Sequence, residues 1–150
     1  MGQSLVKNLL HLVFSTKGHV PVLTDPVRPE LHRYQSGILA DLDSPALAIN
    51  SVTDHVHVLF SLSKNRALAD VIMELKRGSS KWLKTKGAGF AEFHWQNGYG
   101  AFSVSQSAVA EVTDYIGRQA EHHQRVSFQD EFRKLLQKHE KEFDERYVWD

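Results

Sequence analysis

The chain has 150 residues, of which 41% are hydrophobic and 24% are charged, with four prolines and nine glycines. These proportions exclude a disordered or fibrous protein, and the length predicts one domain that spans residues 1–150. Equal numbers of basic and acidic residues give zero net charge, so any nucleic-acid site must be a local surface. Because the sequence has no cysteine, a bound metal would need His, carboxylate or amide ligands.

The first expected elements are a strand and a helix. An apolar run over residues 5–15 predicts the strand, and Asn8 and His11 interrupt it too early for a signal or membrane segment. We therefore expect a cytoplasmic protein without membrane association. Asp25 and Pro26 predict the N-cap and the first position of the helix. Its apolar face is formed by Leu31, Tyr34, Ile38, Leu39 and Leu42.

A hairpin and a second helix are expected next. Strands over residues 46–52 and 56–62 flank the polar turn Thr53-Asp54. A 3.6-residue apolar period then predicts a helix over residues 68–83.

The last third of the chain predicts one strand and two helices. The strand lies around residues 102–104, and Ser105 or Ser107 caps a helix that runs to about His123. Ser127 opens a final helix in the acidic C-terminal segment, to which we assign no role beyond a surface helix. The order β-α-β-β-α-β-α-α predicts an α+β fold of the ferredoxin-like kind, an antiparallel sheet with helices packed on one face.

Two histidines stand two residues apart in the predicted hairpin. On a strand, His55 and His57 leave the same face, while Val56, Val58 and Phe60 occupy the other. Side-by-side imidazoles suit the chelation of one divalent metal, although such a pair is also typical of solvated or core histidines.

Tyr115 and Gln119 lie about 40° apart on the predicted third helix, at the edge of its apolar stripe. A tyrosine in that position is typical of amphipathic packing as well as of a functional site. A separate basic cluster occupies the second helix, at Lys76, Arg77, Lys81, Lys84 and Lys86. It fits either a solvated helix face or a phosphate-binding surface.

Five collinear segments resemble the single-tyrosine HUH transposases, the small enzymes of bacterial insertion sequences and their repeat-associated relatives. The segments are His-Leu-Val-Phe-Ser-Thr-Lys at 11–17, Asp-His-Val-His at 54–57, Leu-Lys-Arg-Gly-Ser-Ser-Lys-Trp-Leu at 75–83, Trp-Gln-Asn-Gly-Tyr-Gly-Ala-Phe-Ser-Val-Ser at 95–105 and Tyr-Ile-Gly-Arg-Gln-Ala-Glu-His-His at 115–123. The resemblance covers almost the whole chain.

The resemblance implies a chemistry and a partner. It implies that His55, His57 and the side-chain oxygen of Gln119 bind Mg²⁺ or Mn²⁺, and that Tyr115 attacks single-stranded DNA beside a hairpin to give a 5′-phosphotyrosine. It also implies a homodimer in which the tyrosine helix completes the partner's metal site, with Gly98 and Gly100 as a hinge or as ordinary turn residues. The candidate phosphate-contacting surface combines Lys76, Arg77, Lys81, Lys84, Lys86, Arg118, His122 and Arg125.

Two other functions fit the same residues. A hydrolytic metalloenzyme would use the His pair with water as the nucleophile, and would need a further His or carboxylate ligand but not Tyr115. A domesticated binding module would retain hairpin recognition without cleavage. The intact set of His55, His57, Tyr115 and Gln119 counts against the loss of chemistry.

Overall fold

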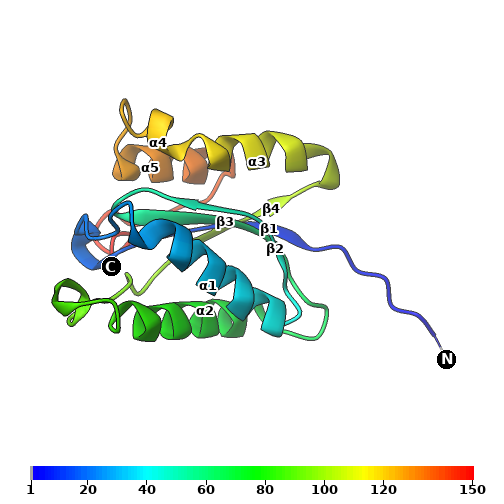
Figure 1. Cartoon of the computed structure of the whole chain (residues 1–150). Coiled ribbons are helices and arrows are strands. Elements are labelled where there is room, and N and C mark those ends of the chain that lie inside the picture. Colours follow the sequence, from blue (N-terminus) through cyan, green and yellow to red (C-terminus); the bar gives the residue numbers. More distant parts are fainter. Residues whose placement is uncertain (1) are drawn as a thin grey trace.

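The computed structural model describes residues 2–150 and contains a four-stranded sheet between two layers of helices (Figure 1). The strands are β1 (Leu9–Ser15), β2 (Ala46–Ser51), β3 (His55–Ser61) and β4 (Gly100–Val104). The α-helices are α1 (Val27–Asp41), α2 (Leu68–Leu83), α3 (Val109–Gly117), α4 (Gln119–His122) and α5 (Phe128–Lys138). Short 3₁₀ turns occupy Lys17–His19, Ala88–Phe90 and Gln106–Ala108.

The sheet is antiparallel throughout, with strand order β2-β3-β1-β4. The predicted antiparallel α+β class is confirmed. The helices, however, cover both faces of the sheet rather than one: α1 and α2 lie on one side, and α3, α4 and α5 lie on the other (Figure 1). The physical reason is that successive residues of β1, such as Leu12, Val13 and Phe14, are all apolar and fully buried. A strand of that kind needs cover on both faces.

Each face of the sheet has its own apolar core. The core beneath α1 and α2 includes alternate residues of the two central strands, namely Leu10, Leu12, Phe14, Val56, Val58 and Phe60. The second core joins Val13 and Phe102 of the sheet to Phe128, Phe132 and Leu136 of α5. The C-terminal helix therefore packs on the sheet, and the expectation of a mere surface helix is wrong.

Helix α2 spans Leu68–Leu83 as predicted, and of the predicted helix N-caps one is correct and two are wrong. The Ser127 hydroxyl caps α5 by accepting a hydrogen bond from the Asp130 backbone N–H at 3.2 Å, as expected. Helix α1 begins at Val27, one residue later than predicted, and Asp25 forms an ion pair with Arg28 instead of capping. Ser105 and Ser107 cap no helix, because their hydroxyls hydrogen-bond each other at 3.0 Å.

Other element boundaries also differ from the prediction. Strand β1 begins at Leu9 rather than at residue 5. The predicted third helix is interrupted at Arg118, where φ of −99° and ψ of 18° separate α3 from α4. No helix within residues 2–150 is long and apolar enough to cross a bilayer.

Candidate metal and tyrosine centre

The histidine pair of β3 is buried on the face covered by α3, α4 and α5. His55 and His57 both have 0% exposure. The residues between and beyond them, Val56 and Val58, enter the opposite core. The predicted same-face geometry is confirmed, and the imidazoles lie in the interior rather than on a solvated surface.

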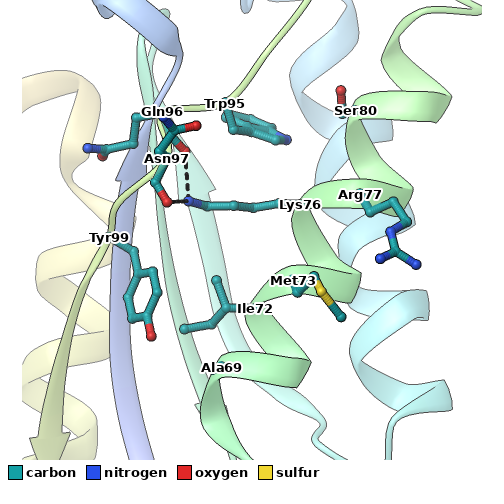
Figure 2. A pocket seen from close by; sticks show the side chains of 10 residues that line it. All are labelled: Ala69, Ile72, Met73, Lys76, Arg77, Ser80, Trp95, Gln96, Asn97 and Tyr99. Atoms are coloured by element: carbon teal, nitrogen blue, oxygen red, sulfur yellow. Dashed lines mark hydrogen bonds between the residues drawn. The ribbon is translucent and has the colours of Figure 1, made fainter. Parts of the chain in front are cut away.

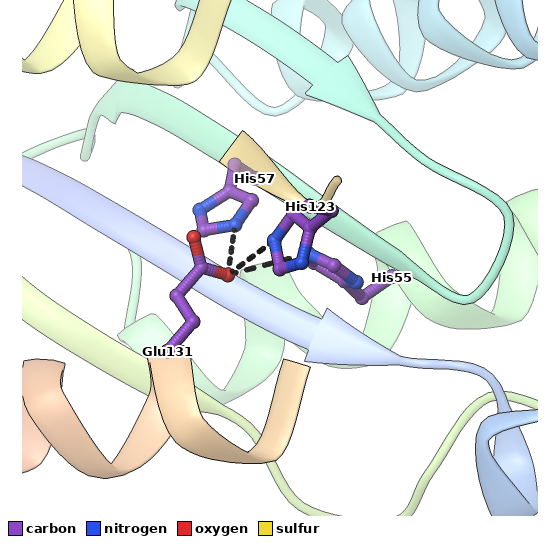
Figure 3. A group of neighbouring side chains, drawn as sticks. All are labelled: His55, His57, His123 and Glu131. Carbon is purple, nitrogen blue, oxygen red and sulfur yellow. Dashed lines mark hydrogen bonds and ion pairs between the residues drawn. The ribbon is translucent and has the colours of Figure 1, made fainter. Parts of the chain in front are cut away.

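A third histidine and a carboxylate converge on this pair (Figure 3). Glu131 Oε1, from α5, lies 3.0 Å from His57 Nε2 and 3.0 Å from His123 Nε2. The same oxygen lies 3.3 Å from His55 Nε2. The four possible ligand atoms of His55, His57, His123 and Glu131 all lie within 4.8 Å of one another.

Each imidazole is held at its other nitrogen by a second group. Nδ1 of His55 contacts Asp54 Oδ1 at 2.7 Å, and Nδ1 of His123 contacts the Val126 carbonyl at 2.7 Å. His57 Nδ1 contacts His11 Nε2 at 2.8 Å. Histidine ligands in metal sites are commonly oriented through the nitrogen that does not bind the metal.

This arrangement fits a cation in the centre. Since Asp54 and the Val126 carbonyl only accept hydrogen bonds, Nδ1 of His55 and of His123 carries the hydrogen. In the neutral imidazole, Nε2 then presents a lone pair toward an oxygen of Glu131. Two acceptors that face each other require a proton or a metal ion between them. Three imidazole nitrogens and a carboxylate oxygen form a set of ligands that divalent transition-metal ions accept in proteins.

Tyr115 and Gln119 complete the cluster. The Tyr115 hydroxyl donates to Glu131 Oε2, and the Gln119 amide nitrogen donates to the same oxygen at 3.2 Å. Gln119 Oε1 lies 3.4 Å from His55 Nε2. The structure thus brings together the four predicted site residues His55, His57, Tyr115 and Gln119, although Tyr115 and Gln119 come from two short helices rather than one.

The charges in the cluster are strongly coupled. Burial alone would raise the pKa of the Glu131 carboxyl, but hydrogen bonds from His123, His55 and His57 outweigh it and hold that pKa far below its usual range. Burial and the adjacent Glu131 carboxylate raise the pKa of the Tyr115 phenol well above its ordinary value of 10.0. In this arrangement Glu131 is ionised and Tyr115 keeps its proton.

A cavity of about 640 Å³ reaches the tyrosine from solvent between β4, α3 and α5. The residues that line it include Tyr115, Glu131, Lys134 and Lys138. A second hollow beside Tyr115 is lined by three predicted phosphate-contacting residues, Arg118, His122 and Arg125. These three lie next to the centre.

The predicted phosphate-contacting residues do not form one surface. Lys76, Arg77, Lys81, Lys84 and Lys86 belong to α2 or directly follow it, on the face of the sheet opposite to Tyr115 (Figure 1). Lys76 also has structural partners, since its ammonium donates to the carbonyl of Gln96 at 2.8 Å (Figure 2) and to that of Gly98 at 2.6 Å. Burial lowers its pKa to about 8.

His123 and Glu131 were missed as candidate ligands by the sequence analysis. Glu131 did leave a signal, because it falls on the apolar stripe of α5 between Phe128 and Phe132. A carboxylate in that position is buried and needs partners. His123 belongs to the segment 115–123 that carries the family resemblance. The sequence predicts one unbroken helix up to this residue, and that helix gave no reason to expect His123 beside the histidine pair.

Comparison with known proteins defines the class. Two solved structures share the fold. One is a protein of Deinococcus radiodurans R1 described as a candidate transposase, with a TM-score of 0.63 and 24% identity over 79% of this chain and 96% of that one. The other is a REP-associated tyrosine transposase bound to a REP hairpin, with a TM-score of 0.60 and 14% identity over 84% of this chain and 74% of that one.

The family profile described as "Transposase IS200 like" matches residues 4–119. This chain therefore belongs to the IS200-like transposase family. No curated protein sequence gives a significant match. Helix α5, with Glu131, lies beyond the matched segment.

Proposed function

We propose that the protein is a metal-dependent transposase that cuts and rejoins single-stranded DNA at hairpin-flanked sites through a 5′-phosphotyrosine. The observation that carries this proposal is the position of the Tyr115 hydroxyl, which donates to a carboxylate whose other oxygen is 3.0 Å from His57 Nε2. Family membership supports the reaction class, and the hairpin bound to the REP-associated relative supports the choice of substrate.

The proposed reaction exchanges one ester linkage for another. The Tyr115 oxygen attacks the phosphorus, so that an Oη–P bond forms while the P–O3′ bond breaks. The phenol loses its proton, and the released 3′ oxygen takes up a proton. A 3′-hydroxyl from another strand reverses these changes and joins the two strands. Since one phosphoester replaces another, the cycle needs no ATP.

His55, His57 and Gln119 are the proposed protein ligands of Mg²⁺ or Mn²⁺. The bound cation would act as a Lewis acid that lowers the phenol pKa and stabilises charge on the phosphate oxygens. The protein's own part is to hold the phenol against the centre and to orient His55 and His57 through Asp54 and His11.

The substrate strand is proposed to reach Tyr115 through the cavity between α3 and α5, with Arg118, His122 and Arg125 near its phosphates. Lys81 on α2 and Lys84 directly after it are exposed, and both are proposed to contact a more distant part of the hairpin. The Tyr115 hydroxyl donates to Glu131 of its own chain, and the centroid of its ring lies 5.8 Å from that of His57. A homodimer that exchanges the tyrosine helix therefore stays a prediction from the family resemblance.

The decisive experiment removes only the Tyr115 hydroxyl. Wild type, incubated with Mn²⁺ and a hairpin oligonucleotide with a 5′ extension, is expected to form a covalent adduct that carries the 3′-side fragment. Tyr115→Phe is expected to form none while remaining folded. The matched control is Tyr147→Phe, because Tyr147 is 64% exposed and lies outside the cluster. An adduct mapped by mass spectrometry to another residue would contradict the proposal.

A metal-dependent hydrolase is the second candidate, because His123 and Glu131 supply the further ligands that such an enzyme needs. The same experiment separates the two functions. A hydrolase would cleave the oligonucleotide at the wild-type rate in Tyr115→Phe, without an adduct in either protein. A binding module would bind the hairpin but cleave nothing.

A further inference from the structure

Glu131 is a carboxylate in an apolar setting. It lies on the buried face of α5, flanked by Phe128 and Phe132, and is 1% exposed. A buried carboxylate is costly unless charged or hydrogen-bonding groups compensate it. Its compensating groups here are the imidazoles of His55, His57 and His123, that of His122 at 3.4 Å, a phenol and an amide. The burial of Glu131 is thus tied to the candidate centre.

The distances from Glu131 Oε1 match those between ligands of one metal ion. In an octahedral site with bonds of about 2.1 Å, neighbouring ligand atoms are about 3.0 Å apart and opposite ones about 4.2 Å. Glu131 Oε1 lies 3.0, 3.0 and 3.3 Å from the Nε2 atoms of His57, His123 and His55. The full set lies within 4.8 Å, so a small contraction would bring every atom into bonding range.

The charge of the site points the same way. His55, His57 and Gln119 are neutral ligands, and all three have 0% exposure. A divalent ion bound only by these residues would leave two uncompensated positive charges in the interior, which is unfavourable. The Glu131 carboxylate halves that charge, and its second oxygen still holds the Tyr115 hydroxyl.

We propose that Glu131 is a further protein ligand of the divalent metal, and that through its other carboxylate oxygen it is the positioning residue for Tyr115. Helix α5, which the family match does not cover, then completes a centre begun on β3. This inference rests on the proposed metal-dependent function.

The test measures metal binding rather than cleavage. Full-length protein freed of metal with a chelator is titrated with Mn²⁺, and the EPR signal of the free ion gives the affinity. Glu131→Gln is expected to weaken binding by about 10-fold or more, and Glu131→Asp, which keeps the charge, is expected to weaken it less. Glu142→Gln is the matched control, since Glu142 is an exposed acid outside the cluster. Circular dichroism checks that each variant is folded.

A second measurement needs no variant. Mn²⁺-loaded wild type labelled with ¹³C at the glutamate carboxyl groups is expected to show a ¹³C hyperfine coupling in ENDOR spectra. An absent coupling, or unchanged or tighter binding by Glu131→Gln, would overturn the assignment of Glu131. His57→Ala separates this failure from that of the proposed function. If His57→Ala also binds Mn²⁺ like wild type, the metal centre itself is wrong.

Discussion

Gly100 offers a direct test of how α5 is seated on the sheet. It opens β4 opposite Val13 of β1. A Cβ atom at this position would lie 2.5 Å from Cε2 and 2.8 Å from Cζ of the Phe132 ring. Carbon atoms in contact prefer separations of about 3.5–4.0 Å, so in Gly100→Ala the ring must retreat by about 1 Å. Phe132 is 2% exposed and has little room to do so.

The expected cost follows from this overlap. Overpacking of a core costs about 1–3 kcal/mol, and the removal of glycine from a strand returns about 0.5–1 kcal/mol. Gly100→Ala should therefore lower the free energy of unfolding by about 1–2 kcal/mol. The smaller side chain in Phe132→Leu relieves the clash, so the double variant should be about 1 kcal/mol more stable than the sum of the single effects predicts.

Urea unfolding of the metal-free protein measures these free energies. Gly89→Ala is the matched control, because an added Cβ there meets no atom within 4 Å. Mn²⁺ affinity should fall in Gly100→Ala and recover in the double variant, since Glu131 precedes Phe132 in the chain. Additive single effects, or a Gly100→Ala variant as stable as wild type, would refute the proposed contact.

Two further predictions concern His32 and Lys76. Burial, with a smaller effect of Arg28, lowers the pKa of His32 from 6.5 to about 4. Between these two pH values His32 is therefore protonated in the unfolded state but neutral in the folded state. The stabilisation from the neutral His32 ring is complete above pH 6.5 and is lost as the pH falls toward 4. Because the ring is only partly buried, solvent screening limits this loss to about 1–2 kcal/mol. Urea unfolding at pH 7 and pH 4.5 should show a smaller pH dependence in His32→Gln than in wild type, and an equal dependence would contradict the shift. Lys76→Met should lower the free energy of unfolding by about 1–3 kcal/mol through the lost hydrogen bonds to Gln96 and Gly98, whereas Lys81→Ala, at an exposed position, should change it by less than about 0.5 kcal/mol.

The sequence was most informative where the local spacing of apolar residues alone decides which side chains are buried. The alternation of β3 was enough to place His55 and His57 on one face, and the apolar period of α2 was enough to place its buried residues. The covering of both faces could also have been predicted, from the unbroken apolar run Leu12-Val13-Phe14.

The missing parts of the site depend on contacts between distant segments. Glu131 and His57 are 74 residues apart, and no local pattern pairs them. The helix break at Arg118 directly follows Gly117, which weakens a helix but does not by itself end one, so the sequence alone did not place the break. The sequence predicts Lys76 in a solvated or phosphate-contacting cluster and gives no sign of its carbonyl partners, because these lie 20–22 residues away in the chain.

The distance in sequence between His57 and Glu131 also sets the time at which the two residues can meet during protein synthesis. A ribosome that adds roughly 5–20 residues per second needs about 4–15 s to extend the chain by the 74 residues between them. Throughout that interval the growing polypeptide carries the histidine pair but lacks the helix that seats the tyrosine against it. A translation product released before residue 131 would lack Glu131, so on the proposed mechanism the order of the chain delays DNA cutting until α5 has been made.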